Sequence, residues 1–316
     1  LLPLILLAAS LSPPGTLAWG QLPHRTIALL STRFLLPETA SFIRTILPKD
    51  ESIAAAAIWG DYFSHTPEGR WSGPLHYIDA HDDPGNGVCG VQLARDCGQE
   101  GMCVVGGIVN VVRTHPYLSY FTFVIHSYTP AHFSLRLLLH LIADIHQPLH
   151  TENLFHGGNS LHVLFSGRDS NLHSTWDSLI PQSLRHGRTP RHALIWADEL
   201  FNSITSLPPA TLHRWAGPCF RDIERLVAEN GGKIPHDEAQ KCAMEWARYT
   251  NSYICRYVFK DGVDSMKGRE LAGEYTENAR DLVDELVGMA GWRLGGWLNL
   301  VVTGKLGLEL GEAAEG

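Results

Sequence analysis

The strongest constraint on how this chain can fold is a largely apolar segment, residues 135–145, that has a histidine and an aspartate among its few polar residues. Its composition predicts a helix, which Pro148 should stop shortly after residue 145. His140 and Asp144 are four residues apart, so both project from the same face of that helix. Burying a carboxylate without a partner is costly, and a charge or a metal ion must therefore compensate Asp144.

Similar pairs of histidine and aspartate occur elsewhere in the chain. They are His173 with Asp177, four residues apart, and His76 with Asp79, three residues apart. Both spacings suit one face of a helix. A lone histidine on an apolar helix is usually a satisfied core residue, but several such pairs, together with His24 and His150, favour a metal site of the kind that suits zinc. The spacing alone leaves the metal and the number of ions open.

Most of the remaining sequence has helical spacing or composition. Helices are expected over residues 52–59, 193–206, 237–257 and 274–302. Residues 80–107 are rich in Gly, Asp and Cys and should form a long loop. Residues 161–165 have the strongest strand composition, so a short hairpin is expected around them. Residues 207–210 contain two prolines and are typical of a loop rather than a domain boundary. The expected fold class is mainly α, in a single domain.

Residues 1–18 have the composition of the end of a secretory signal peptide. An apolar run is followed by two prolines and a glycine, and then by small residues before a cleavage site after Ala18. Because the first residue is Leu, the basic start of the signal is expected to be missing. Cleavage would give Trp19 a free amine. The alternative, a retained membrane anchor, is disfavoured because a span needs about 20 apolar residues.

The chain has six cysteines, which behind a signal peptide favour three disulfides and a secreted protein. Cys97 and Cys103 are close enough in sequence to close a small loop. No CxxC pair is present, so a cysteine zinc site is not expected.

Six motifs carry the residues singled out above, in order along the chain. They are WGQLPH (19–24), WGD (59–61), LHYID (75–79), HLIADIHQPLH (140–150), GGN (157–159) and NLHSTWD (171–177). Together they resemble the secreted zinc-dependent single-strand-specific nucleases of the Aspergillus nuclease type and their plant bifunctional relatives. The resemblance runs from Trp19 to about residue 300 and agrees at nine ligand positions. It implies a helical fold related to that of bacterial zinc phospholipase C, over residues 19–303, with a flexible tail at 304–316.

The resemblance implies three zinc ions per chain. One would be held by Asp61, His76, His140 and Asp144. A second would be held by the amine and carbonyl of Trp19, by His24, and by Asp144 as a bridging carboxylate. A third would be held by His150, His173 and Asp177. Asp61 is also expected to be catalytic, by orienting the attacking water.

Base recognition is expected to come from stacking, which tolerates any base but requires an unpaired strand. The resemblance implies that Tyr77 and His156 face each other across a base pocket and that Asp79 contacts the base edge, with Asn159 supporting the region. The alternative for Tyr77 and His156 is simple packing near the site.

Two positions depart from the pattern of the family. Ser64 stands three residues after Asp61, where a basic residue is often found, and Ser160 follows GGN, where some relatives have lysine. Both departures remove positive charge near the phosphate, which affects the expected rate and substrate preference more than the reaction class.

The resemblance also implies disulfide pairing and bears on the net charge. Cys89 should pair with Cys255 and Cys97 with Cys103, which leaves Cys219 for Cys242. The formal charge of −8 argues at first against a nucleic-acid partner. Three zinc ions would add six positive charges inside the site, so attraction for a phosphate chain would be local.

The expected function is zinc-dependent hydrolysis of single-stranded DNA and RNA to 5′-phosphorylated nucleotides by an endonuclease, with 3′-nucleotidase activity. We expect a secreted monomer without a membrane anchor. One alternative is a phospholipase C-like phosphodiesterase that uses the same metals; another is a secreted zinc-binding protein without catalysis. Tyr77 and Asp79 favour a nucleobase over a lipid, and the complete ligand set disfavours a non-catalytic protein. Preference between DNA and RNA stays open.

Overall fold

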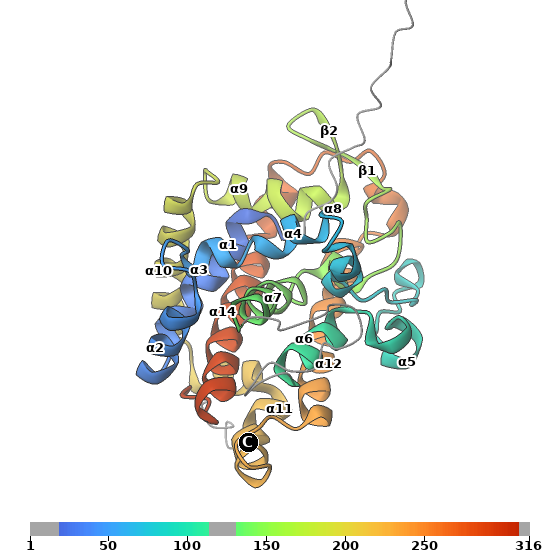
Figure 1. The fold of residues 1–316 in the computed structure, drawn as a ribbon. Coiled ribbons are helices and arrows are strands. Elements are labelled where there is room, and N and C mark those ends of the chain that lie inside the picture. Colours follow the sequence, from blue (N-terminus) through green and yellow to red (C-terminus); the bar gives the residue numbers. More distant parts are fainter. Residues whose placement is uncertain (1–18, 114–130, 310–316) are drawn as a thin grey trace, which may run out of the picture.

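The computed structural model describes residues 19–113 and 131–309, and these form a mainly helical fold (Figure 1). The expected signal peptide and residues 310–316 of the expected tail lie outside the described residues. The α-helices are α1 (Gln21–Ser31), α2 (Pro37–Ile46), α3 (Ile53–Ala56), α4 (Trp59–Ser64), α5 (Leu93–Asp96), α6 (Val104–Arg113), α7 (Ala131–Asp144), α8 (Leu172–Ser174), α9 (Ile180–Leu184), α10 (Pro190–Ile204), α11 (Pro209–Glu229), α12 (His236–Tyr253), α13 (Glu274–Asn278) and α14 (Arg280–Thr303).

Short turns of 3₁₀- or π-helix connect these helices. They are η1 (Thr32–Phe34), η2 (Arg70–His76), η3 (Pro84–Asn86), η4 (Gln99–Gly101), η5 (Pro148–Thr151), η6 (Thr175–Leu179), η7 (Ile254–Val258) and η8 (Val263–Met266). Two of them, η6 and η7, are π-helical. Such turns are frequent at functional sites, and η6 carries one of the predicted ligands, Asp177.

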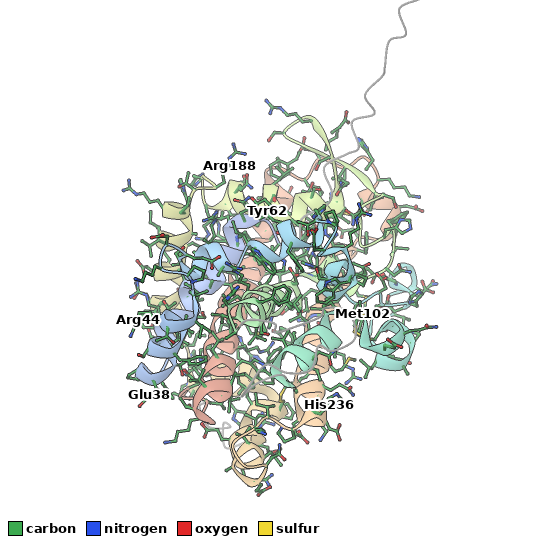
Figure 2. All side chains as sticks on the ribbon, in the orientation of Figure 1. Glu38, Arg44, Tyr62, Met102, Arg188 and His236 are labelled. Atoms are coloured by element: carbon green, nitrogen blue, oxygen red, sulfur yellow. A yellow bond between two sulfur atoms is a disulfide. The ribbon has the colours of Figure 1, made fainter. Side chains whose placement is uncertain are left out.

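The long helix α14 forms the centre of the core and packs against α1, α7 and α10 (Figure 1). Its middle section is buried on all sides, as expected for a helix whose residues are mostly apolar, with Arg293 and Asn299 as buried polar exceptions. Gly291 lets α1 approach closely, because a Cβ atom there would lie 2.6 Å from the side chain of Leu30. Charged side chains such as Glu38, Arg44 and Arg188 lie on the outside (Figure 2).

Most of the helices expected from the sequence are present. The segment 135–145 lies in α7, 193–206 in α10, and 237–257 in α12 and the π-turn η7. The segment 274–302 is divided between α13 and α14. The single helix expected over 52–59 is wrong, because α3 ends at Ala56 and α4 begins at Trp59. The loop expected at 207–210 ends early, because α11 begins at Pro209.

The expected hairpin and disulfides are confirmed. Strands β1 (His162–Phe165) and β2 (Arg168–Asn171) pair antiparallel through a two-residue turn in which Ser166 and Gly167 have positive φ, the geometry of a tight hairpin. The disulfides are Cys89–Cys255, Cys97–Cys103 and Cys219–Cys242. The first holds the long loop, which ends where α6 begins at Val104 rather than at residue 107, against η7. The second closes a small loop within it, and the third joins α11 to α12.

The first part of the expected tail is packed rather than flexible. Leu306 is buried, and its carbonyl accepts a hydrogen bond from Asn299 Nδ2 at 2.7 Å. The flexible tail predicted to begin at residue 304 therefore cannot begin there. Within the described part of the chain, no helix combines the length and apolar character needed to cross a bilayer.

Candidate metal centre

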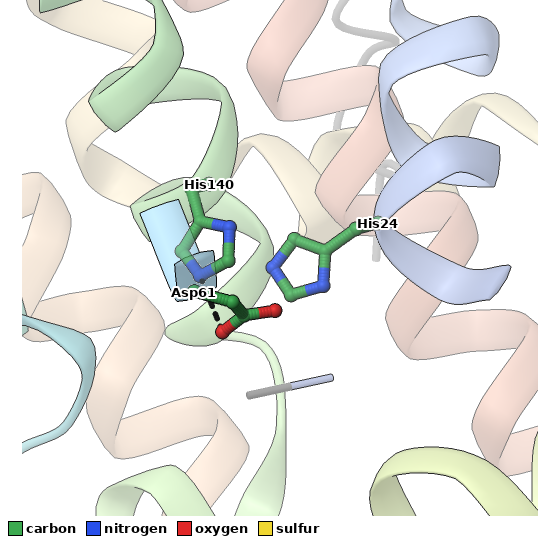
Figure 3. Close-up of side chains that lie close together, drawn as sticks. All are labelled: His24, Asp61 and His140. Atoms are coloured by element: carbon green, nitrogen blue, oxygen red, sulfur yellow. Dashed lines mark ion pairs between the residues drawn. The ribbon is translucent and has the colours of Figure 1, made fainter. Parts of the chain in front are cut away.

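The structure brings the eight predicted side-chain ligands together in the interior, and each is no more than 7% exposed. They come from α1, α4, the end of η2, α7, η5 and the α8–η6 segment. They form three groups, of which two share His140: His24 with Asp61 and His140, His76 with His140 and Asp144, and His150 with His173 and Asp177. Figure 3 shows the first group, which converges from α1, α4 and α7.

Three of these side chains, His76, His140 and Asp144, have the mutual distances of ligands around one small ion, and Asp61 approaches this group at His140. His76 Nδ1 lies 3.0 Å from both Asp144 Oδ2 and His140 Nε2. His140 Nε2 lies 3.2 Å from Asp144 Oδ2 and 3.3 Å from Asp61 Oδ1. A tetrahedral zinc with bonds of about 2.0–2.1 Å has ligand atoms about 3.3 Å apart. These four residues are the set that the resemblance implied for the first ion.

The start of the described chain lies beside this group. Trp19 is fully buried, and its carbonyl oxygen faces His24 Nδ1. His24 Nε2 lies 3.2 Å from Asp144 Oδ1, and its ring stacks on that of His140 with the centroids 4.0 Å apart. Trp19, His24 and Asp144 therefore meet as implied for the second ion, and the role of the Trp19 amine stays a prediction.

The third group lies on the other side of Asp144. His173 Nε2 is 3.2 Å from Asp177 Oδ2, and His150 Nε2 is 3.7 Å from Asp177 Oδ1. The two rings stack with centroids 5.0 Å apart. Gly20 ties this group to the N-terminal segment, because its N–H donates to the carbonyl of Asp177 at 2.8 Å.

Backbone carbonyls set the tautomer of three of the histidines. The Nδ1–H groups donate to carbonyls as follows: His140 to Ala57 at 2.7 Å, His150 to His76 at 2.8 Å, and His173 to Gly157 at 2.6 Å. A carbonyl can only accept, so in the neutral ring Nε2 keeps its lone pair and faces its group. Such outer contacts are typical of histidines that bind metals.

Several buried ligand atoms have no hydrogen-bond partner among the residues that the structure describes. They are His24 Nε2, Asp61 Oδ2, His76 Nε2, Asp144 Oδ1, His150 Nε2 and Asp177 Oδ2. Leaving such atoms unsatisfied in the interior is expensive. Because all are lone-pair donors of the types that zinc prefers, the residues present fit divalent metal ions.

The pKa shifts of Asp144, His76, His150 and His173 favour the forms that bind metal, whereas, against the effect of burial, the charges of Asp144 and Asp61 raise the pKa of His140. Burial alone would raise the pKa of Asp144, but the charge of His140 holds it well below its usual range. Burial lowers the pKa of His76, His150 and His173, which keeps these rings neutral at neutral pH. Burial also raises the pKa of Asp177 to about 7, against the opposing charge of His173. Neutral imidazole and ionised carboxylate are the forms that bind metal.

A cavity of about 450 Å³ opens above the three groups. Its wall includes Asp61, His76, His150 and His173, and also the four predicted substrate-binding residues Tyr77, Asp79, His156 and Asn159. Tyr77 is 40% exposed, so one face of the ring is accessible for stacking. The amide of Asn159 donates to the carbonyl of His156 at 2.8 Å, which links two residues of the wall.

Two sequence expectations change in the structure, whereas the third, that Ser64 lies near the site, is unchanged. The prediction that His76 and Asp79 share one helix face is wrong: η2 ends at His76, Tyr77 is extended, and Asp79 lies in the cavity wall. Ser64 lines the cavity, where its hydroxyl donates to the carbonyl of Asp61 at 2.9 Å. Ser160 does not line the cavity; its hydroxyl donates to the carbonyl of Phe155 at 3.0 Å.

Sequence reasoning missed two further residues of the cavity wall. His65 donates from Nδ1 to the carbonyl of Asp61 at 2.7 Å. Glu152 is 2% exposed, burial raises its pKa to about 8, and it accepts a hydrogen bond from Leu154 N at 2.7 Å. The signal that could have found Glu152 is its position, two residues beyond the motif that ends at His150.

Known proteins resemble the chain over nearly its whole length. Residues 19–303 match the family model described as S1/P1 Nuclease. Nuclease S1 of Aspergillus oryzae is 34% identical over 294 residues, which cover 91% of this chain and 93% of that protein. Nuclease P1 of Penicillium citrinum is 32% identical, with 89% and 97% covered, and Endonuclease 4 of Arabidopsis thaliana is 26% identical, with 92% and 91% covered. The chain therefore belongs to the S1/P1 nuclease family, whose metal dependence agrees with the buried ligand groups.

Proposed function

We propose that this enzyme is a single-strand-specific endonuclease that hydrolyses DNA and RNA to 5′-phosphorylated nucleotides and also acts on 3′-nucleotides. The observation that carries the proposal is the position of three buried ligand groups at the base of a cavity whose wall holds Tyr77 and Asp79. A phosphate at the base and a nucleobase against Tyr77 match this arrangement. Duplex DNA keeps its bases stacked and would leave the Tyr77 ring unused.

The metals are proposed to be three zinc ions. Asp61, His76, His140 and Asp144 would hold one, Trp19, His24 and Asp144 a second, and His150, His173 and Asp177 a third. Zinc bound in this way supplies Lewis-acid stabilisation of the phosphate and a lowered pKa for water. The donor set of nitrogen and oxygen atoms and the distances near 3.3 Å favour zinc over the oxygen-only sites of magnesium or calcium.

The side chains themselves have separable roles. Asp61 keeps one carboxylate oxygen without a hydrogen-bond partner among the described residues and lines the cavity, so it can orient an attacking water. Tyr77 supplies a stacking face, and Asp79 an acceptor for the edge of the base. Burial raises the pKa of Asp79, although nearby His81 opposes this shift.

Lipid hydrolysis is the weaker candidate, because most of the residues that line the cavity have polar side chains and few are apolar, Leu149 and Pro74 among them. One assay separates the alternatives: single-stranded DNA, RNA, a 3′-nucleotide and phosphatidylcholine, each with and without a chelator. We expect cleavage of the first three only while metal is present. Activity that survives complete metal removal, or cleavage of lipid alone, would exclude the proposal.

The N-terminus provides a second test, since we also propose a secreted monomer that begins at Trp19. A form with one extra residue before Trp19 has an amide in place of the amine there. It should bind one zinc less than the processed protein and lose most of its activity. Full activity and full zinc content in the extended form would remove Trp19 from the site.

A further inference from the structure

The turn between α7 and η5 joins two of the ligand groups. Asp144 ends α7 and His150 lies in η5, so only five residues separate ligands of different groups. Gln147 lies in the middle of this turn and is fully buried. It is not a ligand in the proposed set, and its side chain is directed away from solvent.

Both the oxygen and the nitrogen of the Gln147 side-chain amide form hydrogen bonds. Its oxygen accepts the backbone N–H of Leu149 at 2.5 Å, and its nitrogen donates to Asp177 Oδ1 at 2.6 Å. The orientation of the amide follows from chemistry, because Leu149 N can only donate and an ionised carboxylate can only accept. Gln147 therefore links its own turn to a ligand 30 residues further along the chain.

This bond makes the two oxygens of Asp177 unequal. Oδ1 receives the amide, whereas Oδ2 has no hydrogen-bond partner among the described residues and lies 3.2 Å from His173 Nε2. Gln147 thus holds the carboxylate at the rotation that presents Oδ2 to the centre of the third group. Metal affinity depends on such outer contacts by about 10–100-fold.

We propose that Gln147 is a positioning residue for the metal site formed by His150, His173 and Asp177, acting by donating a hydrogen bond to Asp177. The proposal rests on the proposed function, in which this group holds zinc. The competing explanation is that Gln147 only caps η5 through Leu149. Asn251 allows the two to be separated, because its buried amide donates to the carbonyl of Thr151 at 2.8 Å. It supports the same turn, and its hydrogen bond to Thr151 reaches no proposed ligand.

The test compares Gln147→Glu, Gln147→Met and the control Asn251→Asp. Glutamate keeps an acceptor for Leu149 N–H but loses the donor to Asp177, and methionine loses both. The control makes the same amide-to-carboxylate change beside the same turn. Zinc per chain is measured by mass spectrometry after equilibration at graded free zinc, and folding is checked by circular dichroism.

Both Gln147 variants should bind one of the three ions about 10–100-fold more weakly, with Asn251→Asp like wild type. In a His173→Ala background, which already lacks that ion, Gln147→Glu should leave the remaining zinc affinities unchanged. Unchanged or tighter zinc binding by Gln147→Glu overturns the proposal, as does an equal loss in Asn251→Asp. If Gln147→Glu does not fold, the zinc affinity of Gln147→Met is compared with that of the same control. A wild-type protein without zinc would instead refute the proposed function.

Discussion

Replacing Gly20 by alanine should weaken metal binding without disturbing the rest of the fold. A Cβ atom at this position would lie 2.2 Å from Ser178 Oγ and 2.8 Å from the carbonyl oxygen of Asp177. The hydroxyl of Ser178 can rotate away, but the Asp177 carbonyl belongs to the η6 turn that carries a ligand. Gly20 itself has φ −54°, which alanine adopts readily, so the effect is steric contact rather than backbone strain.

The size of the effect follows from these distances. To reach an ordinary contact of about 3.4 Å, the chain at Gly20 and the η6 turn must separate by roughly 0.6 Å, which exceeds the tolerance of about 0.2 Å in a metal–ligand bond. The displacement falls on Trp19 and Asp177, which are assigned to different ions in the proposed site. A shift of this order should lower kcat/KM by about 10–100-fold. Loss of the glycine N-cap of α1 should destabilise the fold by no more than about 1 kcal/mol.

The assay measures zinc per chain and kcat/KM on single-stranded DNA, with urea unfolding as the measure of stability. Gly73→Ala is the matched control, because Gly73 lines the same cavity and an added Cβ there meets no atom within 4 Å. The control should retain full zinc content and activity. If Gly20→Ala also retains both, then the close approach of the N-terminal segment to η6 does not position the ligands, and the reasoning is refuted.

Three further predictions concern the cavity wall. Ser64→Arg adds a cation beside the phosphate and should lower KM for single-stranded DNA by up to about five-fold at low salt, which corresponds to about 0.2–1 kcal/mol. The effect should weaken as the salt concentration rises. If KM and its salt dependence are unchanged, residue 64 lies outside the substrate path. Tyr77→Ala should raise KM by roughly 5–150-fold, since stacking contributes about 1–3 kcal/mol per base. Tyr77→Phe keeps the ring, so its KM should stay near that of wild type. Equal increases in KM for the two variants would argue against stacking. Burial raises the pKa of Glu152 to about 8, so folding favours the protonated carboxyl, and the stability that this form contributes is lost as the pH rises from about 4.5 through 8. In urea unfolding of the zinc-loaded protein between pH 5 and 8.5, Glu152→Gln should therefore lose less stability than wild type. Equal loss of unfolding free energy in the two proteins would contradict this prediction.

Local spacing explains why two pairs of candidate ligands could be predicted before the fold was known, whereas the rest of the set came from the resemblance. His140 with Asp144 and His173 with Asp177 are each four residues apart, and helical geometry alone brings such side chains to one side. His76 and Asp79 show the limit of this reasoning. Their spacing of three suits a helix, but the chain becomes extended at Tyr77, so Asp79 belongs to the cavity wall rather than to the ligand group.

The sequence by itself determined the helical class through residue chemistry and short spacing, and it predicted the ligand set and the disulfide pairing through motifs that resemble those of a known family. Only the tertiary structure decided which groups share a ligand, that Gly20 abuts Asp177, and that Gln147 reaches the same carboxylate across 30 residues. The physical reason is that helix geometry relates residues three or four apart. The distance between His76 and His140, which are 64 residues apart, depends on how α7 and η2 pack in one core.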